Sequence, residues 1–265
     1  MVKKILITGS EGFVGSRLIE KFENKYDLTL FDKKFNRDIT NPESFKGLDV
    51  DYVIHLAAIT RSDNLFEMFD VNVNGTFNVL EFCKNSGANL IFASSSAVYG
   101  NIESPITETS NLNPSSYYAI TKKLGEELCK FYYDNFSVNN TILRIFNPYG
   151  PNQTEGFLIP DILSQLGESE INLGNPYQKR DYIYIDDLVD AIDKSLDLNK
   201  FNIINIGTGT SYCVKELVKK ITDKKVNFSD LSMVESDIYA DISKAKKLLS
   251  WVPKVSLEEG IKYIS

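Results

Sequence analysis

A tyrosine and a lysine four residues apart, Tyr118 and Lys122, form the clearest chemical pair in the sequence. The residues around them have a helical pattern, and a spacing of four places both side chains on one helix face. A nearby ammonium group stabilises phenolate, so we expect the pKa of Tyr118 to fall from about 10 toward the working range. The pair therefore predicts a general acid/base for a hydroxyl or carbonyl oxygen. Tyr117 offers no such partner, because Thr121 stands four residues after it.

Three consecutive serines, Ser94–Ser96, follow the predicted strand Asn89–Ala93. Ligands of parallel sheets bind outside the carboxyl ends of the strands, so a hydroxyl here could hydrogen-bond a reacting oxygen. A polar turn at the strand end is the simpler alternative, and three serines in a row cannot all be catalytic.

A glycine motif, Gly9-x-x-Gly12-x-x-Gly15, connects the predicted strand Lys4–Thr8 to the predicted helix Ser16–Lys25. Glycines allow a tight turn and a close approach of backbone N–H groups to a pyrophosphate. The helix N-terminus adds partial positive charge for that anion. Glycines also serve ordinary turns, but a strand before and a helix after are the context that a dinucleotide site requires.

An aspartate, Asp32, ends the second predicted strand, 23 residues after Gly9. A carboxylate at this place accepts hydrogen bonds from the adenosine ribose hydroxyls and repels the 2′-phosphate of NADP. The sequence therefore favours NAD over NADP, although Lys33 and Lys34 could partly offset the repulsion.

The dipeptide Asp38-Ile39 follows six residues after Asp32. Its carboxylate could accept a hydrogen bond from the adenine amino group, with the isoleucine packed on the ring. The alternative is a turn or N-cap residue before Pro42.

The composition excludes several classes of protein. One histidine, His55, and three scattered cysteines build no usual zinc site and no disulfide framework, so no metal is expected. The net charge is −7 and only five residues are arginine, which is unsuited to binding nucleic acid. No apolar run approaches the roughly 20 residues of a membrane span, and the N-terminal apolar core is too short for a signal peptide. We therefore expect a cytoplasmic protein.

The remaining pattern is an alternation of strands and helices. Apolar strands separated by helices predict an α/β fold, a Rossmann-type doubly wound parallel sheet covered on both faces. Beyond those already named, the predicted elements of this part are Leu28–Phe31, Tyr52–Leu56, Val71–Cys83, Tyr117–Asp134 and Thr141–Phe146.

After Asn147 the elements become shorter and a smaller, interleaved α/β lobe is expected. The turn-rich run Asn147–Gln153 is expected to form neither strand nor helix. Residues 1–149 plus 185–206 are predicted to form the NAD-binding domain, and 150–184 plus 207–265 the substrate-binding lobe. The predicted elements here are Ile171–Leu173, Tyr182–Ile185, a helix from Asp186, Ile203–Ile206, a helix from Val214, and Asp241–Leu249 before Pro253.

Taken together, these motifs resemble the extended short-chain dehydrogenase/reductase family, in its nucleotide-sugar epimerase/dehydratase branch. The resemblance covers nearly the whole chain in order. It is carried by Gly9–Gly15, Asp32, Asp38-Ile39, His55–Ala58, Asn72–Thr76, Ser94–Gly100, Pro114–Glu126, Arg144–Pro151, Arg180–Asp187 and Asp241–Ala245.

The resemblance implies a role for each matching residue. Tyr118 would be the acid/base, Lys122 would bind the nicotinamide ribose and tune Tyr118, and Ser95 would hydrogen-bond the sugar oxygen. His55 would be a packed strand residue. The cofactor would contact Gly9, Gly12, Phe13, Val14, Gly15, Asp32, Lys33, Asp38, Ile39, Leu56, Ala57, Ala58, Asn72, Ala93, Ser94, Tyr118, Lys122 and Phe146. The nucleotide-sugar substrate would contact Ser95, Ser96, Tyr118, Asn147 and Arg180.

The chemistry that the resemblance implies is NAD-dependent 4-epimerisation of a nucleotide sugar through a transient 4-keto intermediate. Dehydratases of this branch carry Asp-Glu after the catalytic Ser/Thr, where this chain has Ser96 and Ala97, so dehydration is not expected. The short Asp32–Asp38 link resembles reductases, so an NAD(P)-dependent reductase or oxidase of a 4-keto sugar is the alternative. A further arginine that usually grips the diphosphate is missing between Val226 and Ser250.

Two further expectations concern the state of the protein. A non-catalytic dinucleotide-binding regulator is the alternative from another class, because a fold can outlive its function.

The resemblance also implies a homodimer, because the family pairs the helices that match Val71–Cys83 and Tyr117–Asp134 into a four-helix interface. The apolar faces of these helices could equally serve the core of a single chain.

Overall fold

The computed structural model describes residues 2–231 and 236–264. The chain divides into two compact units, each assembled from several segments. The first unit consists of 1–100, 110–145 and 189–204, and the second of 101–109, 146–188 and 205–265. The second unit thus includes 101–109, 146–149, 185–188 and 205–206, which the sequence assigns to the NAD-binding domain.

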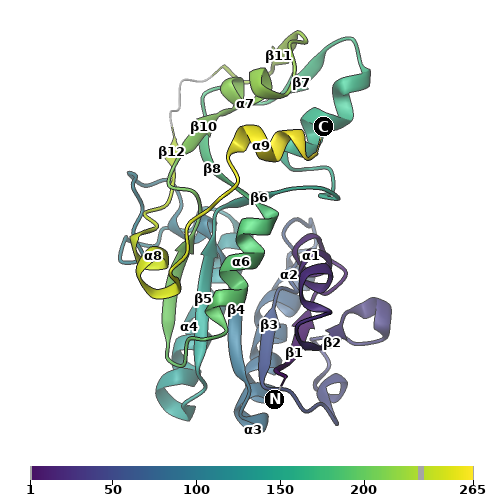
Figure 1. Cartoon of the computed structure of the whole chain (residues 1–265), viewed down its shortest axis with the longest axis vertical. Helices are drawn as coiled ribbons and strands as arrows, with labels where there is room; N and C mark the ends of the chain where they lie inside the picture. Colours follow the sequence, from purple (N-terminus) through teal and green to yellow (C-terminus); the bar gives the residue numbers. More distant parts are fainter. Residues whose placement is uncertain (1, 232–235, 265) are drawn as a thin grey trace. The chain divides into compact units, whose positions relative to one another are not determined.

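A six-stranded sheet forms the centre of the first unit, in the order β2-β1-β3-β4-β5-β9 (Figure 1). Neighbouring strands from β2 to β5 pair in parallel. The chain adds β2 on one side of β1 and then β3, β4 and β5 on the other side, which is the arrangement of a doubly wound sheet. This order confirms the predicted Rossmann-type fold. The strands are β1 (Lys4–Thr8), β2 (Asp27–Phe31), β3 (Tyr52–His55), β4 (Asn89–Ser95), β5 (Asn140–Ile145) and β9 (Asn202–Ile206).

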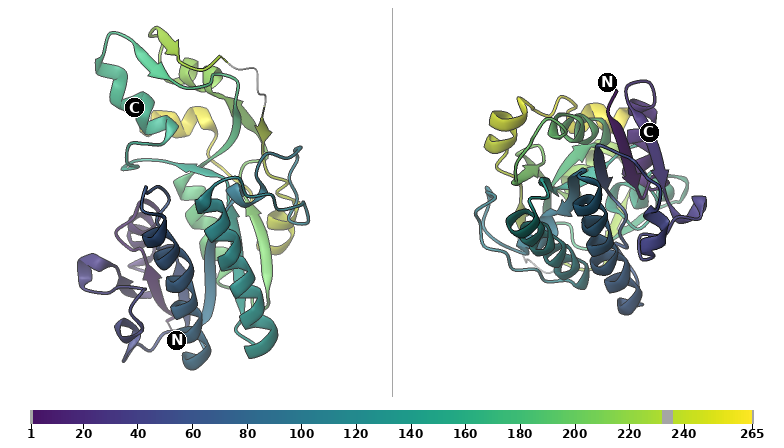
Figure 2. Two further views of the ribbon diagram at one scale, coloured as in Figure 1. Left: turned by 180° about the vertical axis from the view of Figure 1, so that it is seen from behind. Right: turned by 90° about the horizontal axis from the view of Figure 1, so that it is seen from below.

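Helices cover both faces of this sheet. Helices α1 (Phe13–Phe22) and α6 (Ile185–Ser195) lie on one face, and α3 (Gly75–Ser86) and α4 (Tyr117–Phe136) on the other (Figures 1 and 2). A short helix, α2 (Leu65–Phe69), leads through a π-helical turn at Asp70–Asn74 into α3. The apolar faces of α3 and α4 and of the inner strands form one core cluster, which includes Leu6, Val53, Leu80, Phe92 and Ile142.

The predicted helix boundaries differ from the observed ones where a backbone feature intervenes. Helix α1 begins at Phe13 rather than Ser16, because Gly12 is already its N-cap and the glycine motif runs straight into the first turn. The predicted helix Val71–Cys83 is observed as the π-helical turn plus α3, which ends where Gly87 adopts a left-handed φ of 78°.

The second unit is built on strand β8 (Lys179–Tyr184), which pairs with β10 (Ser211–Cys213), β12 (Asp237–Ile238) and β6 (Asn147–Tyr149). The expectation that Asn147–Gln153 contains no strand is therefore wrong. Pro148 is tolerated because β6 pairs with β8 alone, so its missing N–H can face away from the ladder.

The other elements of this unit are short. Strands β7 (Ile171–Leu173) and β11 (Val226–Phe228) pair in parallel. The helices are α5 (Leu158–Ser164), α7 (Val214–Ile221), α8 (Ser243–Leu249) and α9 (Leu257–Lys262). Neither α5 nor α9 is predicted from the sequence, although a capping box of Ser256 and Glu259 marks the start of α9.

Short 3₁₀ turns complete the chain at Lys33–Phe35, Pro42–Phe45, Ser96–Tyr99 and Gln165–Gly167. Among the helices of the described ranges, none has the length and apolar run that crossing a bilayer would need. Over the same ranges, no group of three or more His, Cys, Asp and Glu side chains is placed to hold a metal ion.

Candidate active site

The glycine motif forms a tight turn between β1 and α1, with no room for a side chain at Gly9 or Gly15. Gly9 has a φ of +68°, and a Cβ there would lie 2.8 Å from the backbone of Ala57. A Cβ on Gly15 would lie 2.3 Å from the carbonyl oxygen of Gly9. No side chain caps the N-terminus of α1, so the N–H groups of its first turn stay available to an anion. These features fit the pyrophosphate of a dinucleotide.

This packing makes a prediction for Gly15. Replacing Gly15 by Ala should lower the free energy of unfolding by about 1–3 kcal/mol, because the new methyl group meets backbone rather than a movable side chain. It should also weaken NAD binding by roughly tenfold, since the turn has to open. Urea denaturation and calorimetric titration with NAD⁺ measure the two effects.

The matched control is Gly167→Ala, because a Cβ on Gly167 meets nothing within 4 Å. We expect that variant to keep wild-type stability and NAD affinity. Equal behaviour of the two variants would contradict the role given to the glycine motif.

The carboxylate of Asp32 lies at the end of β2, as predicted, and both of its oxygens accept backbone hydrogen bonds. The N–H of Lys34 donates to Oδ1 at 3.2 Å, and the N–H of Glu11 donates to Oδ2 at 3.4 Å. The side chains of Lys34 and Glu11 form an ion pair with each other. Asp32 is thus held beside the glycine motif, where a ribose would approach.

Ile39 of the dipeptide Asp38-Ile39 lies in the hydrophobic core, whereas the sequence suggested that it could pack on an adenine ring. Asp38 accepts two hydrogen bonds from Thr40, from N at 2.9 Å and from Oγ1 at 2.8 Å. Ile39 is only 5% exposed and belongs to the core cluster, where it packs against Gly75. Its side chain is therefore a core group, which leaves little of it to stack on an adenine ring.

The catalytic candidates Ser95, Tyr118 and Lys122 come together at the carboxyl end of β4 and the first turns of α4. Ser95 hydrogen-bonds the phenol of Tyr118. The Nζ atom of Lys122 is 5.9 Å from the centre of the Tyr118 ring and donates to the carbonyl of Ala93 at 2.8 Å. The spacing of four residues therefore does place phenol and ammonium on one helix face, next to the serine.

The pKa of Tyr118 differs from the sequence expectation. Burial raises it to about 12, and the hydrogen bond with Ser95 opposes this rise. Burial also lowers the pKa of Lys122 to about 8, while nearby Cys129 and Glu126 work in the opposite direction. The expectation that Lys122 brings the pKa of Tyr118 below 10 is wrong for the protein alone, because desolvation disfavours charge on both groups.

A buried ion pair joins α4, the helix that carries Tyr118 and Lys122, to strand β5. Arg144 on β5 contacts Glu126 on α4 at 2.7 Å, and both side chains are almost fully buried. Glu126 also accepts a hydrogen bond from Ser94, and Arg144 donates to the hydroxyl of Tyr99 at 2.9 Å. The hydroxyl of Ser94 is thereby committed to the core, so only its backbone remains for the predicted cofactor contact.

His55 has the structural role that was expected of it. Its ring nitrogens lie 2.7 Å from Oγ1 of Thr8 and 3.0 Å from Oγ1 of Thr76, and the residue is 1% exposed. Burial, with a smaller effect of the charge on Lys122, lowers its pKa to about 3. A neutral, fully bonded imidazole in the core does not act as a base near neutral pH.

Asn72 lies in the π-helical turn and joins three parts of the first unit. Its amide accepts from the N–H of Ile59 at 2.8 Å and donates to the carbonyl of Ile59 and to Oγ1 of Thr121, both at 2.9 Å. The loop Leu56–Ala58, which the resemblance assigns to the cofactor, is thereby held at its far end, while the N–H groups of Leu56 and Ala57 bond Thr8. π-Helical turns are frequent at functional sites, and this one positions loop and catalytic helix together.

A pocket of about 650 Å³ opens beside Tyr118. Leu65 and Met68 contribute apolar surface to it. Its polar lining comes from Thr60, Arg61, Ser62, Asp63, Ser116, Tyr117 and Tyr118. This mixture can hold a polar molecule such as a sugar against the phenol.

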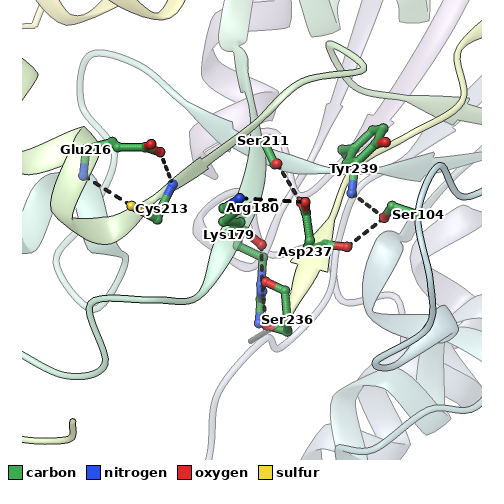
Figure 3. A network of polar contacts seen from close by, with 9 residues as sticks. All are labelled: Ser104, Lys179, Arg180, Ser211, Cys213, Glu216, Ser236, Asp237 and Tyr239. Carbon is green, nitrogen blue, oxygen red and sulfur yellow. Dashed lines mark hydrogen bonds and ion pairs between the residues drawn. The ribbon is translucent and has the colours of Figure 1, made fainter. Parts of the chain in front are cut away.

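Phe13 and Val14 begin α1 and Ser96 begins the 3₁₀ turn after β4, whereas Phe146, Asn147 and Arg180 lie in the second unit. Phe146 is fully buried directly after β5. Asn147 on β6 pairs with Tyr182 of β8 and donates to the carbonyl of Asp181 at 2.9 Å, one residue after Arg180. The guanidinium of Arg180 donates to Oγ of Ser236 at 2.6 Å and to the carbonyl of Lys179 at 2.7 Å (Figure 3). Asn147 and Arg180 therefore share one sheet, as contacts to a single substrate group would require.

Several functional groups were missed or left without a role by the sequence analysis. They are Glu11 beside Asp32, Thr121 beneath Asn72, and the Glu126–Arg144 pair. Glu126 and Arg144 were visible as parts of motifs, but their pairing joins residues 18 apart in different elements. No local spacing signals such a contact.

The fold and this site together define a dinucleotide-binding α/β protein with a tyrosine–lysine–serine constellation. The family model for the NAD-dependent epimerase/dehydratase family matches residues 5–207. The chain belongs to this family, which confirms the resemblance found in the sequence.

The chain is similar to several enzymes that are named for UDP-sugars. A UDP-glucuronate 4-epimerase of Thermodesulfobacterium geofontis is 32% identical over 97% of this chain and 93% of its own length. A UDP-glucuronic acid decarboxylase of Arabidopsis thaliana is 30% identical over 97% of this chain and 86% of its own length. The solved UDP-glucose 4-epimerase of Thermotoga maritima, with UDP-glucose, has a TM-score of 0.91 and 29% identity, covering 98% of this chain and 96% of that one.

Proposed function

We propose that the protein is an NAD-dependent nucleotide-sugar 4-epimerase that works through a transient 4-keto intermediate. The observation that carries the proposal is the convergence of Ser95, at the end of β4, with the half-buried Tyr118 and with Lys122 on one face of α4. Similarity to 4-epimerases over almost the whole chain supports it.

In this proposal each residue of the constellation has one task. Tyr118 takes the proton of the sugar 4-hydroxyl and later returns it to the oxygen. Ser95 orients that oxygen through its hydroxyl, and Lys122 adds positive charge beside the phenolate. The same proton carrier serves both directions, because the sugar is oxidised and then reduced again at the same carbon.

The glycine motif, Asp32, the Leu56–Ala58 loop and Lys122 would hold the cofactor. Bound NAD supplies the hydride acceptor and, in its oxidised form, a positive charge that favours the phenolate of Tyr118. This charge opposes the desolvation that raises the pKa of Tyr118 to about 12 in the protein alone.

For the substrate, we propose that Arg180 and Asn147 bind the diphosphate. A guanidinium suits phosphate oxygens in geometry and charge. The sugar would occupy the pocket beside Tyr118, whose lining of hydroxyl groups and Arg61 suits a polar ring.

Decarboxylation of a nucleotide sugar acid is the second candidate, favoured by the 30% identity to a UDP-glucuronic acid decarboxylase. Both reactions begin with oxidation at the 4-position, so the Ser95, Tyr118 and Lys122 set serves either. The reductase alternative differs from both, since it consumes NAD(P)H in proportion to product.

One panel assay separates these reactions. Purified protein with NAD⁺ is incubated with UDP-glucose, UDP-galactose, UDP-glucuronate and UDP-galacturonate, and the products are resolved by chromatography. We expect a sugar epimerised at C4 with no net NADH and no CO₂. Release of CO₂ from a uronate would show a decarboxylase, and net formation of NADH would show an oxidase. An unchanged panel would contradict the proposed function, and a reductase would then be tested with NAD(P)H and a 4-keto nucleotide sugar.

We also propose that the protein forms a homodimer through α2, α3 and α4. These helices expose an unusual number of large apolar side chains, namely Leu65, Phe66, Phe69, Phe77, Ile120, Leu124, Phe131 and Phe136. Phe66 is 82% exposed. A patch of this kind on a soluble surface marks an interaction site, and the family resemblance implies a second copy as its occupant.

The dimer proposal predicts an effect of charge within this patch. Phe77 on α3 is 45% exposed, and Phe77→Glu should convert a dimer of two 30.0 kDa chains into monomers, because burying an unpaired carboxylate is costly. Light scattering after size-exclusion chromatography measures the mass. Leu248→Glu, which changes a leucine on α8 that is 38% exposed, should remain dimeric, and a monomeric wild-type chain would contradict the proposal.

A further inference from the structure

The adenosine end of the proposed NAD site carries charges of both signs, and the structure pairs them with one another. Three carboxylates and three cations lie within a short stretch of the fold, namely Glu11, Asp32, Asp38, Lys33, Lys34 and Arg37. NADP differs from NAD only by a 2′-phosphate at this end, so what these cations contact decides whether they can serve that phosphate.

Lys34 is the cation most closely tied to the ribose-binding carboxylate. Its N–H bonds one oxygen of Asp32, while the N–H of Glu11 bonds the other. Its ammonium group pairs with the carboxylate of Glu11 across 23 residues of sequence. This contact also raises the pKa of Lys34.

The two other cations are engaged as well. The Nζ atom of Lys33 is 3.4 Å from Oδ2 of Asp38. Arg37 donates to the carbonyl of Ser44 at 2.8 Å, and its guanidinium lies 5.7 Å from the centre of the Phe31 ring. Lys33 and Lys34, which by sequence could have offset the repulsion by Asp32, are thus both paired with other carboxylates.

We propose that Glu11 is a specificity residue that makes the site select NAD over NADP by holding Lys34. The inference rests on the proposed NAD site and adds a residue to it. A 2′-phosphate would meet the negative charges of Glu11 and Asp32, and it would have to share the ammonium group of Lys34 with Glu11. Without the carboxylate at position 11, the same lysine becomes a phosphate ligand.

The test measures binding, independently of turnover. Titration calorimetry gives the Kd of NAD⁺ and NADP⁺, and of 5′-AMP and 2′,5′-ADP, which isolate the 2′-phosphate, for the wild-type chain, Glu11→Gln, Lys34→Gln and the double variant. Glu11→Gln should raise the affinity for NADP⁺ relative to NAD⁺ by about tenfold, and 150 mM added salt should shrink this gain. The double variant should lose it, and Lys34→Gln alone should keep the wild-type ratio.

Glu43→Gln is the matched control, since it removes the carboxylate from another exposed lysine pair, with Lys46, and should leave the ratio unchanged. A ratio that stays within twofold in both Glu11→Gln and Glu11→Ala would overturn the inference, as would a gain that survives the loss of Lys34. A wild-type chain that prefers NADP⁺ would also overturn it. A wild-type chain that binds neither dinucleotide would instead contradict the proposed function.

Discussion

Replacing Tyr118 by Phe should lower kcat by about 10³-fold, the largest effect that we expect from any single substitution in this protein. The change removes one oxygen, the atom that Ser95 hydrogen-bonds and that the proposed reaction protonates and deprotonates. The phenyl ring keeps the packing, so the variant should stay folded and should still bind NAD⁺. The epimerisation rate on the best sugar of the panel and a calorimetric titration measure the two properties.

Tyr117→Phe is the control for Tyr118. It makes the same chemical change one residue away, also at the pocket beside Tyr118. We expect it to lower kcat by less than roughly tenfold, because Tyr117 lacks a lysine four residues on. A Tyr118→Phe enzyme that keeps more than a tenth of the wild-type rate would reject the acid/base role of Tyr118.

Replacing Arg144 by Met should lower the free energy of unfolding by about 3–5 kcal/mol. Arg144 is the cation that balances Glu126 in the core, with side-chain exposures of 4% and 6%. Removing it leaves a buried carboxylate that keeps the hydrogen bond from the hydroxyl of Ser94 but has lost its counter-charge. Chemical denaturation in urea measures the loss.

Two comparisons make this stability prediction specific. Arg17→Met breaks the pair with Glu20 on the surface of α1, where exposures are 27% and 56%, and should cost less than about 1 kcal/mol. The double variant Arg144→Met, Glu126→Leu should recover most of the loss, since it removes the unpaired charge as well. A single Arg144→Met variant as stable as wild type would show that Glu126 carries no buried charge.

The Arg144–Glu126 pair also bears on the proposed function, because it joins the elements that carry the proposed catalytic side chains. Glu126 lies one turn after Lys122 on α4, and Arg144 lies beside Ser94 in the register of β4 and β5. The pair therefore fixes the helix with Tyr118 and Lys122 against the strand with Ser95. We regard it as the reason why this constellation is held in place before any ligand arrives.

Much of the first unit could be predicted from sequence because its signals are local. The strand β1 is observed at its predicted bounds, and β2 to β5 differ from their predicted bounds by at most two residues at an end. Apolar β-branched runs and glycine stops carry this information within a few residues. The second unit was harder, since α5, α9 and β6 are short and depend on contacts with distant segments.

The site shows the same division. The spacing of Tyr118 and Lys122 on one helix face, and of the glycines before α1, follows from backbone geometry and could be counted in the sequence. The contact of Asn72 with Thr121 spans 49 residues, and that of Ser94 with Glu126 spans 32. Contacts at such separations depend on how strands and helices pack, so no spacing rule contains them.

The sequence by itself determined the fold class, the dinucleotide motif, the spacing of Tyr118 and Lys122, and the family, because each rests on residue type and spacing along the chain. Only the tertiary structure decided which charges are buried and which are paired. Burial raised the pKa of Tyr118, against the direction that its lysine neighbour suggested. Folding likewise placed Glu11 against Lys34. Both outcomes depend on solvent exclusion and on contacts between separate elements, which arise when the chain packs.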